Sequence, residues 1–282
     1  MILPDTSQGY LFSEYAPRGG PRQYRPVLTA TENGKGVLDV DTVKGCACGM
    51  SAYPKGGCYG ECYARKGAAR SGINFAVAVS RRLTPSGRVD AYCTVRNHRA
   101  TWYRIGVSGD PSHDWENTLA VCEYLKPTGK VPVVITKHWR TLTGADVARF
   151  AAVSAVFNTS LSGMDTDQEI QHRVRQMHRL REAGMVSACR VITCRYGNTA
   201  WGNAARAKQD YLLSLGDIID TPLRATKSNE RVLSGDILLS RIEWAVGWKH
   251  ISLHRDDVFM GTCDKCPDQC GVPKISPENK TT

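Results

Sequence analysis

Four cysteines lie close together in a glycine-rich stretch of the chain, residues 45–64. Cys48, Cys58 and Cys62 are the main candidates for metal ligands, and Cys46 is a rival for the first position. Soft thiolates gathered on one loop bind soft metals, either zinc or an iron–sulfur cluster. Three thiolates would leave one iron of a [4Fe–4S] cluster open, and an open iron can hold a small molecule and deliver an electron to it.

A zinc site is the alternative for the same loop. Cys46 and Cys48 form one closely spaced pair and Cys58 and Cys62 form another, as in zinc sites that use four thiolates. A disulfide pair would need an oxidising compartment. Residues 1–31 contain four prolines and no apolar run long enough for export, so we expect a cytoplasmic chain whose 11 cysteines serve metals before disulfides.

A second group of thiols lies near the C-terminus. Cys263, Cys266 and Cys270 fall within eight residues, with proline and glycine beside them. This spacing indicates a separate metal site, and an auxiliary iron–sulfur cluster and a structural zinc both remain open. Either site would hold an otherwise loose C-terminal segment in place.

The composition indicates a globular chain with a basic surface. The 282 residues carry a formal net charge of +10, and no stretch approaches the roughly 20 apolar residues of a membrane span. We therefore expect no membrane partner. A basic surplus suggests a polyanion such as DNA, RNA or a nucleotide, although an ordinary solvated basic surface explains it as well. Residues at predicted strand ends that could hold phosphates or stack on bases are Lys137, Arg195, Tyr196, Trp201, Arg224 and Lys227.

Strand-like and helix-like segments alternate along the chain. The run at 131–136 is short, apolar and β-branched, as in a fully buried strand, whereas 167–183 has apolar residues at helical spacing. Asp114 and Thr143 are candidate N-caps of the helices that follow them. The predicted strands are 37–43, 104–107, 131–136, 155–159, 188–194 and 217–223, and the predicted helices are 73–83, 115–126, 143–153, 167–183 and 203–215.

Six strands joined by short connections and helices predict an α/β fold with a parallel sheet. Right-handed crossovers would curl this sheet into a partial (βα)6 barrel, and an open doubly wound sheet is the alternative. The predicted organisation is an irregular N-terminal arm at 1–30, the barrel at 31–240 and a Cys-rich metal-binding extension at 241–282. In such barrels the chemistry takes place at the carboxyl ends of the strands, where the cysteine loop would lie.

Three segments resemble a family of phage-encoded proteins that are similar to the radical S-adenosylmethionine (SAM) superfamily. They are the element Cys58-Tyr59-Gly60-Glu61-Cys62-Tyr63-Ala64, the strand end Ser108-Gly109-Asp110 and the strand end Thr136-Lys137. The likeness covers roughly residues 40–270. The cysteine spacing departs from the Cys-x3-Cys-x2-Cys pattern common in the superfamily, and Ser108-Gly109-Asp110 stands where the superfamily has Gly-Gly-Glu.

The resemblance implies a [4Fe–4S] cluster that reductively cleaves SAM, with electrons from a donor such as flavodoxin or ferredoxin. It also implies action in a host cytoplasm, on a nucleic acid or nucleotide substrate. The expected cofactor-binding residues at the strand ends are Ser108, Gly109, Asp110, Ser160 and Ser162. Asp110 would accept hydrogen bonds from the SAM ammonium.

Two further functions fit the same residues. One is a non-catalytic nucleic-acid-binding protein that carries an iron–sulfur cluster or zinc. The other is a radical enzyme that acts on a protein or a small metabolite, with the basic surface incidental.

Overall fold

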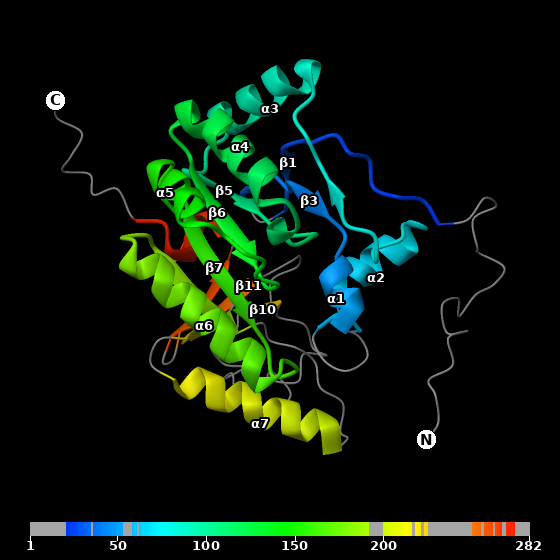
Figure 1. Cartoon of the computed structure of the whole chain (residues 1–282), viewed down its shortest axis with the longest axis vertical. Coiled ribbons are helices and arrows are strands. Elements are labelled where there is room, and N and C mark those ends of the chain that lie inside the picture. The colour runs from blue at the N-terminus through cyan, green and yellow to red at the C-terminus, as the bar shows by residue number, and fades with distance from the viewer. Residues whose placement is uncertain are drawn as a thin grey trace.

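The computed structural model describes residues 21–34, 36–52, 58–60, 62–191, 200–215, 218–220, 223–224, 250–254, 257–261, 263–266 and 269–273 (Figure 1). Within these ranges, no helix is both long enough and apolar enough to cross a membrane.

A mostly parallel sheet forms the centre of the molecule (Figure 1). Its seven strands lie side by side in the order in which they occur along the chain, and only β1 runs antiparallel to its neighbour. The strands are β1 (Thr31–Glu32), β2 (Leu38–Asp39), β5 (Trp102–Ile105), β6 (Val131–Thr136), β7 (Val156–Leu161), β8 (Ser187–Val191) and β9 (Ile218–Asp220). Because six neighbouring strands are parallel, their carboxyl ends meet at one edge of the sheet.

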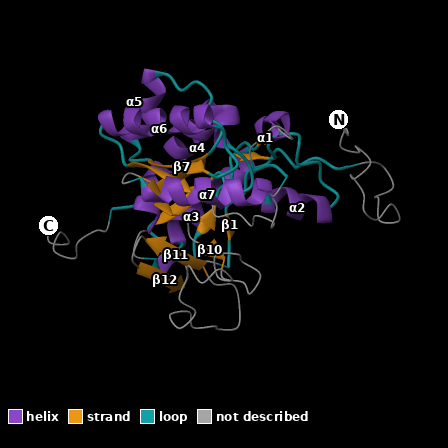
Figure 2. Ribbon diagram, turned by 90° about the horizontal axis from the view of Figure 1, so that it is seen from below, coloured by secondary structure: helices purple, strands orange, loops and turns teal. Residues whose placement is uncertain are grey.

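The helices connect and cover these strands. Helix α6 contacts β7 and β8, and α4 packs against α5. Figures 1 and 2 both show α1 and α2 on the side of the sheet away from α5. The helices are α1 (Ala47–Ala52), α2 (Tyr63–Arg70), α3 (Pro85–Asn97), α4 (Trp115–Leu125), α5 (Gly144–Ala152), α6 (Asp167–Glu182) and α7 (Ala200–Ser214), and short 3-10 turns lie at η3 (Pro111–Asp114) and η4 (Lys126–Thr128).

The two faces of the sheet have different environments. Tyr103, Val134 and Phe157 belong to the large apolar core beneath α4 and α5. Their neighbours along the strands, such as Val133 and Val156, pack in a smaller cluster on the other face. Alternation of side chains along each strand produces this division, and burial on both faces explains the nearly continuous apolar strands.

Two smaller sheets complete the described chain. One pairs β3 (Val43–Lys44) with β4 (Val79–Ser80), and the other has the order β10 (Leu223–Arg224), β11 (His250–His254), β12 (Asp257–Gly261). After β12 the chain forms two 3-10 turns, η6 (Cys263–Lys265) and η7 (Gln269–Gly271). Cys263, Cys270 and Val272 pack on the face of the main sheet that carries Val133 and Val156.

Most of the elements predicted from sequence are present, and the α/β class with a parallel sheet is confirmed in this general form. The strand 131–136 has the predicted bounds, and helices α4, α5, α6 and α7 lie within two to three residues of their predictions. Asp114 caps α4, and Thr143 forms a reciprocal capping box at the start of α5.

The predicted helix at 73–83 is wrong. This segment instead contains β4, and its ends form parallel bridges from Ile73 to Arg22 and from Arg82 to Val27. Residues 21–30 therefore belong to the fold in part, and Leu28 is in the main core. The nearby helix is α3, which begins after the Thr84 N-cap. Residues 1–20 and 225–249 lie outside the described residues, as do the predicted strand residues 192–194.

Candidate functional site

The cysteine loop follows β3, a strand of the small two-stranded sheet, and begins beside the loop that follows β5. The Gly45 amide donates to the Ser108 carbonyl at 3.0 Å, and Gly45 and Gly109 form a parallel bridge. The two backbones approach so closely at this point that a Cβ on Gly109 would lie 2.4 Å from the Val43 carbonyl oxygen. The predicted strand end Ser108-Gly109-Asp110 therefore supports the base of the cysteine loop.

Replacing Gly109 by Ala should destabilise the protein, because the added methyl group meets backbone atoms that have no freedom to rotate away. We expect a loss of about 1–3 kcal/mol, the usual range for overpacking. Gly144→Ala is the control, since no atom lies within 4 Å of a Cβ at that position. Equal thermal unfolding midpoints for the two variants would contradict the close approach.

Three thiols of the loop lie within electrostatic reach of one another. Charges on Cys58 and Cys62 both raise the pKa of Cys46, and Cys46 and Cys62 pack against the same small cluster around Tyr59. Cys48 instead accepts a hydrogen bond from the Arg140 guanidinium at 3.5 Å. Within the described ranges, no three His, Cys, Asp or Glu side chains are arranged so that they could hold a metal ion.

Burial dominates the protonation of these thiols. It raises the pKa of Cys46 to about 12, with a further contribution from the negative charge of Asp110. Burial also raises the pKa of Cys58, although the positive charges of Lys137 and Arg173 act in the opposite direction. In the metal-free protein both groups are therefore thiols at neutral pH, and binding a metal would release their protons.

The raised pKa of Cys46 predicts slow alkylation of the metal-free protein. At pH 8 only about one in 10⁴ of these groups is a thiolate, so iodoacetamide should modify Cys46 far more slowly than the exposed Cys93. The rate at Cys46 should rise about tenfold per pH unit from pH 7 to 10 without a plateau. Peptide mass spectrometry measures both rates, and a plateau below pH 9 would disprove the shift.

His138 borders the thiol group from the neighbouring strand end. A Cβ on Gly49 would lie 2.8 Å from the Cys46 Sγ and 3.5 Å from the His138 Nε2, so Gly49 leaves room for both side chains. Burial lowers the pKa of His138, and the nearby Lys137 acts in the same direction. A neutral imidazole in this place is chemically able to bind a metal or accept a proton.

Buried carboxylates hold the strand-end loops together. Asp41, which follows β2, accepts hydrogen bonds from the backbone amides of Gly106, Val107 and Ser108. Burial raises the pKa of Asp41, and the amides of Val107 and Gly106 oppose this effect. Asp41 thus fixes the loop that follows β5, the next strand in the sheet. Sequence reasoning did not identify Asp41.

Asp110 repeats this arrangement one strand further along. Its Oδ1 accepts from the Ser112 amide at 3.0 Å and the Thr136 hydroxyl at 2.7 Å. Its Oδ2 accepts from the Lys137 and His138 amides at 2.8 and 2.7 Å. The carboxylate that the sequence assigned to the SAM ammonium is thus occupied by the chain itself, so we give Asp110 a structural role in place of cofactor binding.

The next strand end carries a buried ion-pair group. Asp165 is fully buried and accepts from the Lys137 Nζ at 2.7 Å, while Arg173 of α6 lies 2.6 Å from the same oxygen. The hydroxyl of Ser162 accepts from Lys137 at 3.1 Å. Ser160 lies in β7 in register with Arg190 of β8. The two serines were predicted as cofactor ligands; Ser162 is used to position Lys137.

Sequence reasoning named Lys137 and Ser162 as site residues but did not identify Asp165 or Arg173 as partners of Lys137. An available signal was the position of Asp165 in the loop that follows β7, because acids in such loops tie neighbouring loops together here. Arg195, Tyr196 and Lys227, also predicted as phosphate or base contacts, lie outside the described residues, and so do the side chains of Trp201 and Arg224.

The C-terminal thiols lie away from the first loop on the face of the sheet described above. Cys263 and Cys266 are buried, and Cys270 is half-buried with a left-handed backbone (φ 56°). Burial lowers the pKa of Arg104, but the charge of Asp39 outweighs it and the pKa is raised, with smaller contributions from Cys263 and Cys270. Asp39 is the direct ion-pair partner of Arg104, at 2.8 Å.

Comparison of the chain with protein-family models, with curated proteins and with solved structures found no match.

Proposed function

We propose that this protein is a radical SAM-like iron–sulfur enzyme of phage type that modifies a nucleic acid or a nucleotide. The proposal is carried by the electrostatic interaction of Cys46, Cys58 and Cys62 with one another, next to the carboxyl edge of a parallel sheet whose strands follow sequence order. Sequential parallel order is what a partial (βα)6 barrel requires, and the barrel mouth is where such folds carry their chemistry.

The donor atoms fit an iron–sulfur cluster in type and surroundings. Three thiols are the usual ligand set of a cluster with one open iron, and the charges of Lys137 and Arg173 favour the thiolate form of Cys58. As placed, the described side chains do not form a closed ligand group, so cluster binding requires the thiols to draw together. A bound cluster would supply one electron to SAM, delivered from a donor such as flavodoxin or ferredoxin.

The chain's own residues would position and shield this chemistry. Asp41 and Asp110 fix the loops after β5 and β6, so the walls around the thiols are rigid. Tyr63 of α2 donates to the Val107 carbonyl at 2.5 Å and joins the cysteine segment to the same edge. A preorganised edge of this kind would hold reacting groups in place.

The proposal is tested on protein purified and reconstituted without oxygen. We expect iron and sulfide in equal amounts, a paramagnetic signal after reduction, and 5′-deoxyadenosine when SAM and a reductant are added. Stoichiometric zinc without sulfide would overturn the proposal in favour of a non-catalytic zinc protein. Iron and sulfide without 5′-deoxyadenosine would leave an iron–sulfur protein and reject the SAM activity.

The C-terminal thiols are proposed to hold a separate metal, either zinc or a second cluster. Replacing Cys263, Cys266 and Cys270 together by Ser should lower the metal content without removing the signal of the first site. Unchanged metal content and an unchanged unfolding midpoint would contradict this second site.

A further inference from the structure

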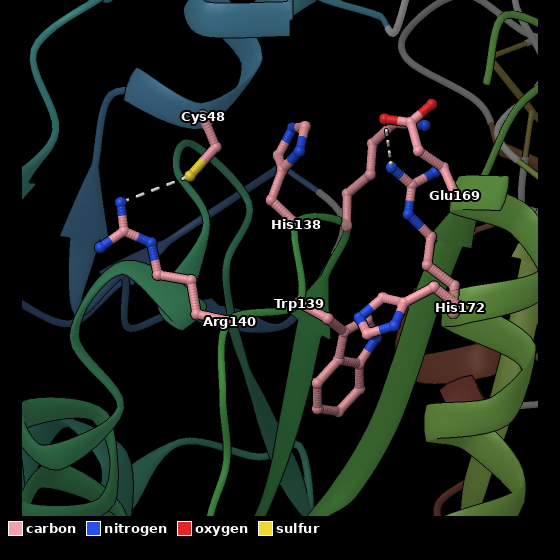
Figure 3. A pocket seen from close by; sticks show the side chains of 8 residues that line it. Cys48, His138, Trp139, Arg140, Glu169 and His172 are labelled. Carbon is pink, nitrogen blue, oxygen red and sulfur yellow. Dashed lines mark hydrogen bonds and ion pairs between the residues drawn. The ribbon is translucent and has the colours of Figure 1, made fainter. Parts of the chain in front are cut away.

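A pocket of about 190 Å³ opens beside Cys48, between the end of β6 and the first turns of α6 (Figure 3). Its eight lining residues include five cationic or imidazole side chains, which are Lys137, His138, Arg140, His172 and Arg173. Figure 3 shows Arg140 reaching toward Cys48 at one end and Glu169 at the other, with His138 between them. The lining therefore offers hydrogen-bond donors from both sides.

Two of the cations are fixed by acids within the protein. Lys137 and Arg173 share the buried carboxylate of Asp165, and Arg173 also contacts Glu169 at 3.4 Å. The shared acid lowers the net charge of this end of the pocket and holds both side chains in place. Lys137 and Arg173 therefore line one end of the pocket with fixed side chains whose charge is partly neutralised.

Arg140 differs from them. Its side chain is exposed, and among the described residues it contacts no carboxylate; its partner is the Cys48 thiol at 3.5 Å. A guanidinium presents five N–H donors in one plane, so most of them are available to a ligand. The rings of His138 and His172 line the space beside it. Arg140 is thus the group best placed to bind an anion.

We propose that this pocket binds the phosphate group of a nucleotide, with Arg140 as its main ligand and His138 and His172 as further donors. Arginine forms paired hydrogen bonds with phosphate oxygens. The Arg140 guanidinium at the rim of the pocket is suited to this because it is not paired with a carboxylate among the described residues. The pocket volume is below the roughly 300 Å³ of pockets that enclose a drug-sized ligand. The phosphate therefore enters the pocket and the nucleoside extends outward. The role of this pocket as a substrate site rests on the proposed function, whereas the binding of phosphate to the pocket does not depend on it.

The test is calorimetry on the full chain with inorganic phosphate, adenosine 5′-monophosphate and adenosine. We expect both phosphate-bearing probes to bind and adenosine to bind at least about tenfold more weakly than its monophosphate, the usual effect of a charge-assisted hydrogen bond. Arg140→Gln should weaken both phosphate probes about tenfold for the same reason. Arg96→Gln, an equal charge change on the exposed face of α3, should leave both affinities unaltered.

Any of three results would overturn the proposal that this pocket binds phosphate. These results are that the unaltered chain binds no phosphate, that Arg140→Gln and Arg96→Gln weaken phosphate binding equally, or that adenosine and its monophosphate bind with equal affinity. His172→Asn is a second variant, expected to weaken phosphate binding with no change in the unfolding midpoint. Iron analysis of each preparation separates the two proposals: a protein that holds iron but not phosphate rejects the pocket alone, and the reverse result rejects the cluster alone.

Discussion

Replacing Asp110 by Asn should lower the free energy of unfolding by about 3 kcal/mol, the usual penalty for breaking a buried, charged hydrogen-bond group. The carboxylate accepts from four donors, and its two oxygens serve different segments of the chain. An amide has one acceptor oxygen, so its NH2 group must face at least one backbone N–H. That N–H is then buried without an acceptor.

The same substitution should change how stability depends on pH. Burial alone would raise the pKa of Asp110, but His138 and the bonds from Thr136 and Lys137 outweigh it, and the pKa lies below its usual value. A lowered pKa in the folded state stabilises the protein above the unfolded value, near 3.9, and this contribution is lost as the pH falls further. The difference between the two proteins should therefore shrink below about pH 4.

Chemical denaturation at pH 7 and pH 3.5 measures this prediction. Asp90→Asn is the matched control, because Asp90 is exposed on α3 and the charge change is the same; its effect should stay within about 0.5 kcal/mol. A variant at Asp110 that unfolds like the control would show that the four bonds carry little stability. A variant that keeps its stability but loses SAM binding would restore the cofactor role inferred from sequence.

Local patterns predicted the elements that local interactions determine. The β-branched run Val131–Thr136 is buried on both faces, and Thr143 starts α5 through a capping box that involves the residue three positions away. These signals lie within a few residues of each other, so the sequence displays them directly.

Long-range pairing decided what the sequence failed to predict. Residues 73–83 resemble a helix in their apolar content, yet their backbone pairs with residues 22–27 and with Thr42. The role of Asp110 depends on Thr136 and Lys137, which lie 26 and 27 positions away. No spacing rule identifies such partners, because they are set by which strands become neighbours in the sheet.

The choice between Cys46 and Cys48 as the first ligand also depends on long-range contacts. Both precede Cys58 at plausible distances, and spacing alone left the first ligand open. The fold separates the two, because Gly45 is held against the loop after β5 and α1 begins at Ala47. Charges on Cys58 and Cys62 both raise the pKa of Cys46, whereas Cys48 accepts a hydrogen bond from Arg140.

Replacing Cys46 by Ser should therefore abolish iron binding at this loop, and replacing Cys48 by Ser should leave most of it. Serine keeps the size of the side chain but is a poor ligand for iron–sulfur clusters, which are held by thiolates. The measurement is iron and sulfide per chain after anaerobic reconstitution, with the visible absorbance as a second readout. Cys93→Ser, on the exposed face of α3, is the control and should retain full iron content.

Three outcomes would count against this assignment. Loss of iron in Cys48→Ser but not in Cys46→Ser would make Cys48 the first ligand and the separation of the two thiols irrelevant. Equal loss in both would indicate a site that needs four thiolates, as zinc does. Unchanged iron and sulfide in a variant lacking Cys46, Cys58 and Cys62 together would reject a cluster held by these three thiols, because Cys48 would then be the one thiol left among the described residues of this loop.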